Sequence, residues 1–424
     1  MSKLLEFNLI NSTQSIINSD ILDFEEKSKT AFNLLINKTG KGNEWLGWMD
    51  LPNHLTPDLL KHLHSSAKSF SKLDAVVIVG IGGSYLGTRA IISALQKDNT
   101  PKIFYAGYHL SEKSTKELFD HLKGKDYGVI VISKSGTTLE PAIAYRLLQS
   151  DMLTKYNNQE IIDRTIFITD PTSGALRKLA EEKAITTFEI PKSVGGRYSI
   201  LTPVGLLPAL IAGINIELLI DGAKEMKKSL ETKQSHYNYL IKYVSLRNSL
   251  YKGGKKTEVM AGFQPHFNFL YKWWQQLFGE SEGKELKGIF PVCVDYTTDL
   301  HSMGQFMQQG DMSFFETIIS VKNLSNDICI PNLNTDLDRL NFLAGKSLEF
   351  VNMQAEAGTI KAHSEGNVPV MQFTLDAINE KCIGAFLYFF QTACTVSAYV
   401  LDVNPFDQPG VEDYKANMKA LLVK

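Results

Sequence analysis

Residues Ala75–Ser84 read AVVIVGIGGS, an apolar run that ends in a glycine-rich turn. A short continuous run of this kind, rich in β-branched residues, is typical of a strand buried on both faces of a parallel sheet. A helical stretch, Leu86–Gln96, follows the turn. The segment therefore predicts one strand–helix unit of a doubly wound sheet, in which ligands bind beyond the carboxyl ends of the strands.

The same alternation continues along the chain. The other candidate strands are Lys102–Tyr105, Gly128–Ser133, Thr165–Thr169, Thr186–Ile190, Thr257–Gly262, Gly288–Val294, Phe315–Val321 and Val370–Thr374. Helices of the second half are expected at Tyr237–Tyr251, Thr298–Gln309, Lys346–Ala362 and Ala377–Leu401. The pattern predicts an α/β chain with a parallel sheet, more clearly in the first half than in the second. Residues from about Met1 to Ser71 look helical and amphipathic, so we expect them to cover the edge of a sheet.

Composition limits the class of protein. A chain of 424 residues is too long for one core, which predicts two domains with terminal pieces. The formal net charge is −2 and no basic block is present, which argues against nucleic-acid binding. No signal-peptide core stands at the N-terminus. The cysteines form no CxxC pair and lie in apolar runs, which predicts buried thiols in a reducing, cytoplasmic compartment: Cys293, Cys329, Cys382 and Cys394.

One segment, Gly384–Val403, is about as long as a membrane-spanning helix. It carries polar residues such as Gln391 and Asp402, and no second segment resembles it. We therefore expect a helix buried between layers of a soluble protein, and no membrane association.

Two loops at predicted strand ends suit an anion. In Gly80–Ser84, glycines let backbone N–H groups approach a phosphate at the start of a helix. A dinucleotide fingerprint fails there, because Tyr85 stands where a third glycine is needed. The alternative is a tight turn that needs glycine only for steric reasons.

The second loop holds four hydroxyls, one lysine and one glycine between a strand and a helix: Ser133, Lys134, Ser135, Gly136, Thr137 and Thr138. Hydroxyl and backbone donors around an anion make a phosphate site, although the Walker spacing is missing. A helix N-cap would need only one of these hydroxyls, so the phosphate site is favoured.

Two further stretches carry charged residues of catalytic type. In Lys192–Gly205, Arg197 follows two glycines and can either stabilise an oxyanion or pair with backbone carbonyls. In Trp273–Lys284, we expect a helix from about Pro265 to Phe278 that Gly279 ends. Glu280 would then lie behind an aromatic helix end, where a desolvated carboxylate suits a proton-transfer base. The alternative is a solvated loop with a Glu280–Lys284 pair.

Taken together, these stretches resemble the glucose-6-phosphate isomerase family. Residues 192–205, KSVGGRYSILTPVG, and 404–415, NPFDQPGVEDYK, resemble its two signatures, and GIGGS, SKSGTT, GESEGK and His301 fall in the family's order. The form GESEGK resembles the shorter bacterial branch. SKSGTT departs from the commoner SKTFTT, with Ser135 and Gly136 in place of Thr and Phe.

The resemblance implies two doubly wound sugar-isomerase domains, expected at 72–213 and 214–403, between a helical segment at 1–71 and a turn and helix at 404–424. It also implies a homodimer whose active sites are completed across the interface, and no cofactor or metal ion. By itself His301 is a lone polar residue and Lys415 a surface lysine near Glu412 and Asp413.

The resemblance gives these residues roles in reversible isomerisation of glucose 6-phosphate and fructose 6-phosphate through a cis-enediol(ate). Glu280 is the base, Arg197 stabilises the enediolate, and His301 of the partner subunit and Lys415 serve ring opening. The phosphate contacts are Ser84, Ser133, Lys134, Ser135 and Thr138, and the sugar contacts are Gly83, Gly196, Gln276 and Gln408. Two alternatives stay open: an isomerase that also accepts mannose 6-phosphate, and a non-catalytic sugar-phosphate sensor.

Overall fold

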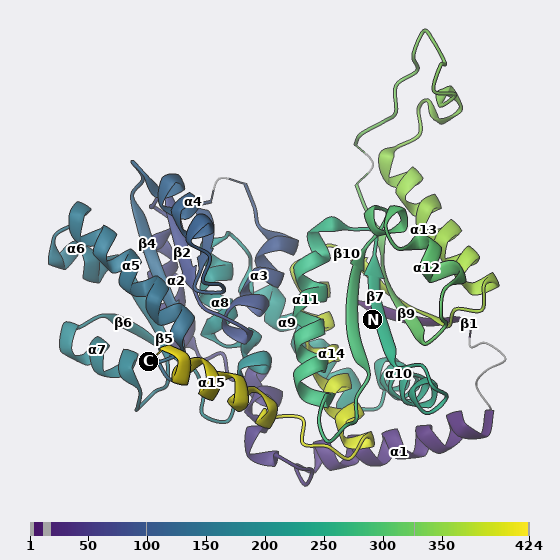
Figure 1. The fold of residues 1–424 in the computed structure, drawn as a ribbon, viewed down its shortest axis with the longest axis horizontal. Helices are drawn as coiled ribbons and strands as arrows, with labels where there is room; N and C mark the ends of the chain where they lie inside the picture. The colour runs from purple at the N-terminus through teal and green to yellow at the C-terminus, as the bar shows by residue number, and fades with distance from the viewer. Residues whose placement is uncertain (1–3, 12–17, 99, 326, 423–424) are drawn as a thin grey trace.

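The computed structural model describes residues 4–11, 18–98, 100–325 and 327–422, and its strands form two five-stranded sheets (Figure 1). The first sheet has the order β3-β2-β4-β5-β6, and all its neighbouring strands are parallel. Its strands are β2 (Ala75–Val79), β3 (Lys102–Ala106), β4 (Tyr127–Ile132), β5 (Thr165–Thr169) and β6 (Thr186–Glu189). The order reverses between β2 and β4, so the loops after these two strands lie at the switch point where such sheets bind ligands.

Helices cover both faces of this sheet, which explains the continuous apolar strands. Val76 and Ile78 belong to the large central core, whereas Val77 and Val79 belong to a second cluster on the other face. That second cluster is closed by α4 (Glu112–Leu122), α5 (Leu139–Lys155), α6 (Asn158–Asp163) and α7 (Ala175–Lys183). On the central side lie α2 (Pro57–Phe70), α3 (Gly83–Leu95) and α8 (Pro203–Ile211).

The second sheet has the order β1-β10-β9-β7-β8. Its parallel strands are β7 (Thr257–Gly262), β8 (Phe290–Asp295), β9 (Phe314–Asn323) and β10 (Val370–Ala377). The outer face packs on α13 (Leu348–Glu365) and α12 (Gly304–Gln309). The expected doubly wound α/β fold is confirmed, and the second half repeats it with four parallel strands.

The N-terminal segment is not wholly helical, contrary to expectation. Leu5–Asn11 forms strand β1, which pairs antiparallel with β10 at the edge of the second sheet. Leu5 and Phe7 are buried while Asn8 is exposed, a period-two alternation that a helical interpretation overlooks. The segment therefore extends a sheet instead of covering its edge. Helix α1 (Asn18–Ile36), the 3-10 helix η1 (Asn43–Asn53) and α2 follow it.

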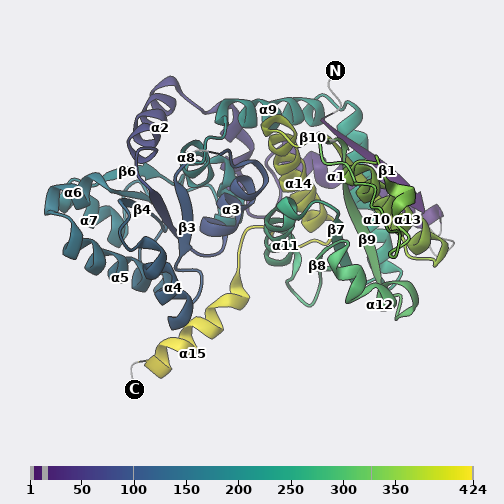
Figure 2. The ribbon, with the colours of Figure 1, turned by 90° about the horizontal axis from the view of Figure 1, so that it is seen from above.

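A layer of helices joins the two sheets: α9 (Ile216–Glu231), α10 (Ser235–Lys252), α11 (Asn268–Glu282) and α14 (Glu380–Val400) (Figures 1 and 2). Among the described residues, α14 is the one helix long and apolar enough to cross a membrane, but 94% of its apolar window is buried inside the protein. Its 18 consecutive buried residues, Cys382–Tyr399, make it a central core element.

Three local expectations were wrong. Helix α11 does not end at Gly279 but continues to Glu282, so Glu280 lies in its last turn. The stretch Thr298–Gln309 is not one helix: a 3-10 turn, η4 (Thr298–His301), precedes α12, and Asp299 accepts hydrogen bonds from the Asp295 backbone and the Ser302 hydroxyl, which compete with helix continuation.

The third concerns the cysteines. All four are free thiols, but only Cys382 and Cys394 are buried, Cys293 is half-buried and Cys329 is exposed. Cys329 lies in the segment 327–347, which projects from the top of the second sheet before α13 (Figure 1). Its apolar neighbours did not predict burial, because Ile328 is itself 68% exposed.

Candidate active site

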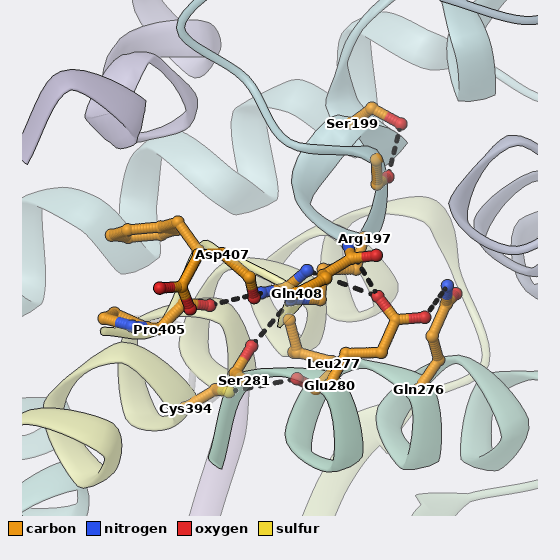
Figure 3. A network of polar contacts seen from close by, with 12 residues as sticks. Arg197, Ser199, Gln276, Leu277, Glu280, Ser281, Cys394, Pro405, Asp407 and Gln408 are labelled. Atoms are coloured by element: carbon orange, nitrogen blue, oxygen red, sulfur yellow. Dashed lines mark hydrogen bonds and ion pairs between the residues drawn. The ribbon is translucent and has the colours of Figure 1, made fainter. Parts of the chain in front are cut away.

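The last turn of α11 places Glu280 between three polar side chains (Figure 3). Gln276, one turn earlier, donates to Glu280 Oε1 at 2.9 Å. Arg197 Nη1 lies 3.2 Å and Gln408 Nε2 lies 3.0 Å from Glu280 Oε2. The carboxylate is thus held by groups from three segments that lie far apart in the sequence, and its side chain is 31% exposed.

Arg197 is the centre of this network. Its side chain is 1% exposed, and it lies in the 3-10 helix η2 (Gly196–Leu201). Besides Glu280, it donates to Ser281 Oγ at 2.8 Å, to the Pro405 carbonyl at 2.5 Å and to the Asp407 carbonyl at 3.4 Å. The pairing of Arg197 with backbone carbonyls is therefore confirmed. Its stabilisation of an oxyanion stays a prediction, although a guanidinium N–H also points at the candidate base.

The glycine loop after β2 lies directly against the Arg197 loop. A Cβ on Gly83 would stand 2.1 Å from the Gly196 carbonyl oxygen, so only glycine permits this approach. Gly82 has φ +58°, and a Cβ there would lie 3.1 Å from Gln276 Nε2. Ser84 follows in the first turn of α3, whose N-terminus faces the same region. The structure thus brings together Gly83, Ser84, Gly196, Arg197, Gln276, Glu280 and Gln408.

The loop after β4, residues 133–138, lies beside the residues grouped around Glu280. Ser133 Oγ accepts from the Gly136 N–H at 3.0 Å, and Ser135 Oγ accepts from the Thr137 N–H at 3.2 Å. Thr138 occupies the N-cap position of α5, yet its hydroxyl makes no capping bond. The capping interpretation therefore does not account for Thr138, and the hydroxyls stay grouped around the N-terminus of a 17-residue helix.

Lys134 of this loop reaches the Arg197 segment. Its Nζ donates to the Lys192 carbonyl at 3.0 Å and the Val194 carbonyl at 3.3 Å, and it lies 4.8 Å from the centre of the Trp45 ring. Burial lowers the pKa of the Lys134 ammonium. The ammonium thus joins the hydroxyl-rich loop to the segment that precedes Arg197.

Two predicted residues do not join Glu280 in this chain. Lys415, on helix α15 (Glu412–Leu422), pairs with Glu412 at 2.8 Å, and this bond raises the pKa of its ammonium. His301 follows the carboxyl end of β8, whereas the end of α11 lies at the start of β8, where a Cβ on Gly279 would stand 3.4 Å from Pro291. A six-residue strand spans roughly 20 Å, so His301 and Glu280 lie toward opposite ends of β8.

Sequence reasoning missed two partners. The Glu280–Lys284 pair, considered above as an alternative, does not form: Lys284 Nζ lies 2.8 Å from the Asp407 carboxylate and donates to the Asn404 carbonyl. Ser281 binds Arg197, and its position next to the candidate base was the one available signal. Within the part of the chain that the structure describes, no group of three or more His, Cys, Asp and Glu side chains could hold a metal ion.

Two parallel-sheet domains with a glycine-rich loop at the switch point and a carboxylate–guanidinium pair beside it define a protein of the sugar-isomerase fold. A hypothetical protein from Thermus thermophilus has the same fold, with a TM-score of 0.90 at 25% identity over 99% of this chain and 100% of that one. A glucose-6-phosphate isomerase from Chlamydia trachomatis shares the fold at a TM-score of 0.78 and 16% identity, over 100% of this chain and 89% of that one.

The chain belongs to the phosphoglucose isomerase family, which it matches over residues 58–423. It is 48% identical to a glucose-6-phosphate isomerase of Leptospira biflexa, over 94% of this chain and 91% of that protein. It is 45% identical to one of Parabacteroides distasonis, over 100% of this chain and 97% of the relative.

Proposed function

We propose that this protein catalyses the reversible aldose–ketose isomerisation of glucose 6-phosphate and fructose 6-phosphate, since it belongs to the phosphoglucose isomerase family and its relative from Leptospira biflexa is named a glucose-6-phosphate isomerase. The observation that carries the proposal is the contact of Glu280 with Arg197, beside two phosphate-type loops at a sheet switch point. The reaction needs one base that takes and returns a proton, and a cation near the enediolate oxygens.

In this mechanism Glu280 takes the C2 proton of glucose 6-phosphate, which leaves a cis-enediol(ate) intermediate. Glu280 then returns the proton to C1. Arg197 meets the negative charge that develops on the C1 and C2 oxygens, because its guanidinium is buried and held by four acceptors before substrate binds. The phosphate, bound by the hydroxyls of Ser133, Ser135 and Thr138 and by Ser84 at the start of α3, supplies binding energy remote from the reacting carbons.

We propose further that the protein is a homodimer with shared sites. The separation of His301 from Glu280 along β8 supports this, because His301 can serve ring opening only in a site whose Glu280 comes from another subunit. Lys415 would approach the same sugar ring from α15. The four free thiols suit the cytoplasm, where we place the reaction, in glycolysis and gluconeogenesis.

The test is an assay of the purified protein with fructose 6-phosphate, coupled to oxidation of the glucose 6-phosphate that forms. In D₂O, glucose 6-phosphate recovered from the enzyme should carry deuterium at C2. Mannose 6-phosphate, assayed in parallel, separates the strict isomerase from one that accepts both epimers. If the protein binds hexose phosphate but incorporates no deuterium, the proposed isomerase activity is wrong and the protein is a sugar-phosphate sensor.

A further inference from the structure

The turn Asn404–Gln408 is held down by two buried cations. Lys284 Nζ donates to the Asn404 carbonyl and lies 2.8 Å from Asp407 Oδ1. Arg197 donates to the Pro405 and Asp407 carbonyls of the same turn. The Lys284 side chain is 8% exposed and that of Arg197 1%. Only the last residue of the turn, Gln408, reaches the candidate base, 3.0 Å from Glu280 Oε2.

The turn also directs the C-terminal helix. Helix α15 begins at Glu412, four residues after Gln408, and none of its described side chains is buried. In Figure 2 it extends away from the rest of the molecule, beyond α4. Since no described side chain of α15 is buried, the position of Lys415 depends on where the turn is anchored.

This anchor has an electrostatic cost. Burial lowers the pKa of the Lys284 ammonium, and the neighbouring Arg197 guanidinium lowers it further. A buried ammonium beside another cation is retained only when acceptors satisfy it. The Asp407 carboxylate and the Asn404 carbonyl supply those acceptors, so cation and turn stabilise each other.

We propose that Lys284 is a positioning residue: it fixes the Asn404–Gln408 turn, and through it the contact of Gln408 with Glu280 and the approach of Lys415 to the sugar. The inference rests on the proposed isomerase function for its kinetic consequence but not for its structural one. Misplacement of catalytic groups by about 1 Å can cost about a hundredfold in rate.

The kinetic experiment compares Lys284→Met with the wild type. We expect kcat to fall by between about tenfold and about a hundredfold. The inhibition constant of glucitol 6-phosphate, an open-chain ligand that needs no ring opening, should change by less than about threefold, because the phosphate loops are untouched. Lys284→Arg, which keeps the charge, should recover part of the lost kcat.

The structural experiment is amide hydrogen exchange, followed by mass spectrometry, on peptides that cover 402–422. In Lys284→Met the amides of the turn, such as Phe406, should exchange at least about tenfold faster than in the wild type, while peptides of α11 stay protected. Asp407→Asn keeps the lysine and removes only its charged partner, so its changes in kcat and in exchange rate should be smaller than those of Lys284→Met. It takes the place of Lys284→Met if that variant does not fold.

The matched control is Lys41→Met. Lys41 also pairs with an aspartate, Asp402, at 2.7 Å and donates to its carbonyl at 2.8 Å, but this pair is exposed and Asp402 precedes the turn. The control should match the wild type in kcat and in exchange of the turn.

Unchanged kcat in Lys284→Met, or a lower kcat with unchanged exchange of the turn, overturns the inference. If the wild type itself proves inactive, only the proposed isomerase function is contradicted. The hydrogen-exchange experiment still decides whether Lys284 anchors the turn.

Discussion

Three consecutive residues at the end of α11 face three different surroundings. Glu280 points into the candidate site, Ser281 binds Arg197, and Glu282 is fully buried, with Arg247 Nη1 2.5 Å from its Oε1. Two carboxylates in the last turn of a helix are disfavoured by the helix dipole. The guanidinium groups of Arg197 in η2 and Arg247 in α10 offset this, so ion pairs tie the end of α11 to both of these helices.

Glu280→Gln tests the base directly. The amide keeps the shape of the side chain and its contact with Gln276 but cannot accept a proton, so kcat should fall at least about a hundredfold. Glucitol 6-phosphate should still bind, since the anion loops are intact. Steady-state kinetics and competition by glucitol 6-phosphate measure the two quantities. Turnover close to that of the wild type would remove Glu280 from the mechanism.

Glu282→Gln tests the buried carboxyl by pH. Burial raises the pKa of Glu282 above its unfolded value of about 4.3, although Arg247 opposes the shift. A raised acid pKa gives stability that is fully present below the unfolded pKa and is lost as pH rises through the folded pKa, by at most about 1.4 kcal/mol per pH unit. The Tm of the wild type minus that of the variant should therefore decrease from pH 5 to pH 8.

The control is Glu285→Gln. Glu285 is 60% exposed and pairs with Lys287 at 3.3 Å, so its Tm difference from the wild type should stay flat over the same range. A flat difference for Glu282→Gln as well would mean that the Glu282 carboxyl stays ionised in the folded protein.

At the scale of elements, α9 and α14 pack through reciprocal glycines. A Cβ on Gly384 of α14 would stand 1.8 Å from the Leu219 carbonyl oxygen, and one on Gly222 of α9 would stand 1.9 Å from that of Lys381. Both contacts are with backbone, which cannot move aside as a side chain can. Helices α9 and α14 therefore touch more closely than any larger residue at these two positions allows.

Gly384→Ala should destabilise the protein by about 2–3 kcal/mol, in the range of overpacked cores. Gly358→Ala is the matched control, because Gly358 lies in α13 with nothing within 4 Å of a Cβ. There alanine should be neutral or should stabilise by up to about 1 kcal/mol. Thermal unfolding measures both. Equal Tm values for the two variants would contradict the close packing of α9 on α14.

The loop after β4 gives the second prediction at this scale. Ser133→Ala and Thr138→Ala should each weaken fructose 6-phosphate binding by roughly 1.5–3 kcal/mol, the value of a hydrogen bond to a charged group. Thr154→Ala, at the far end of α5 where the hydroxyl bonds to Asp151, should leave KM unchanged. An unchanged KM in the Ser133→Ala/Thr138→Ala double variant would count against a phosphate site in this loop.

At the scale of the molecule, the candidate site lies between two domains that one core joins. The central cluster contains Val76 and Ile78 of the first sheet and Phe315 and Phe373 of the second. The site therefore rests on a continuous framework, while two proposed catalytic residues lie outside it. His301 is at the far end of β8, and Lys415 is on a helix without buried side chains.

Mixing two inactive variants tests the shared site. Glu280→Gln and His301→Ala homodimers should each be inactive. A hybrid has one site with both defects and one with neither, because a two-fold interface exchanges the same patch in both directions. With random exchange, about half the dimers are hybrids and about a quarter of wild-type activity should return. Mass spectrometry verifies that the subunits exchange. If they exchange and no activity returns, His301 acts in its own subunit or has no part in the reaction.

Local signals in the sequence were enough to recognise the parallel strands, the two loops and Arg197 as features. The bounds of β5 and β7 match their apolar runs, since a buried strand needs only consecutive side chains of one kind. The glycine and hydroxyl loops could be recognised because each needs only a few adjacent residues. Most of the assignments of residues to the site came from the resemblance of motifs to a family, and not from periodicity.

Only the tertiary structure decided the contacts between distant segments. Strand β1 pairs with β10, and Lys284 pairs with Asp407, over one hundred residues later, instead of with Glu280. Helix α11 continues through Gly279, although glycine costs about 1 kcal/mol in a helix. Burial of Phe278 and the bonds of Arg197 and Arg247 to the next three residues outweigh that cost. Such energies depend on which surfaces meet, and no short-range pattern along the chain records that.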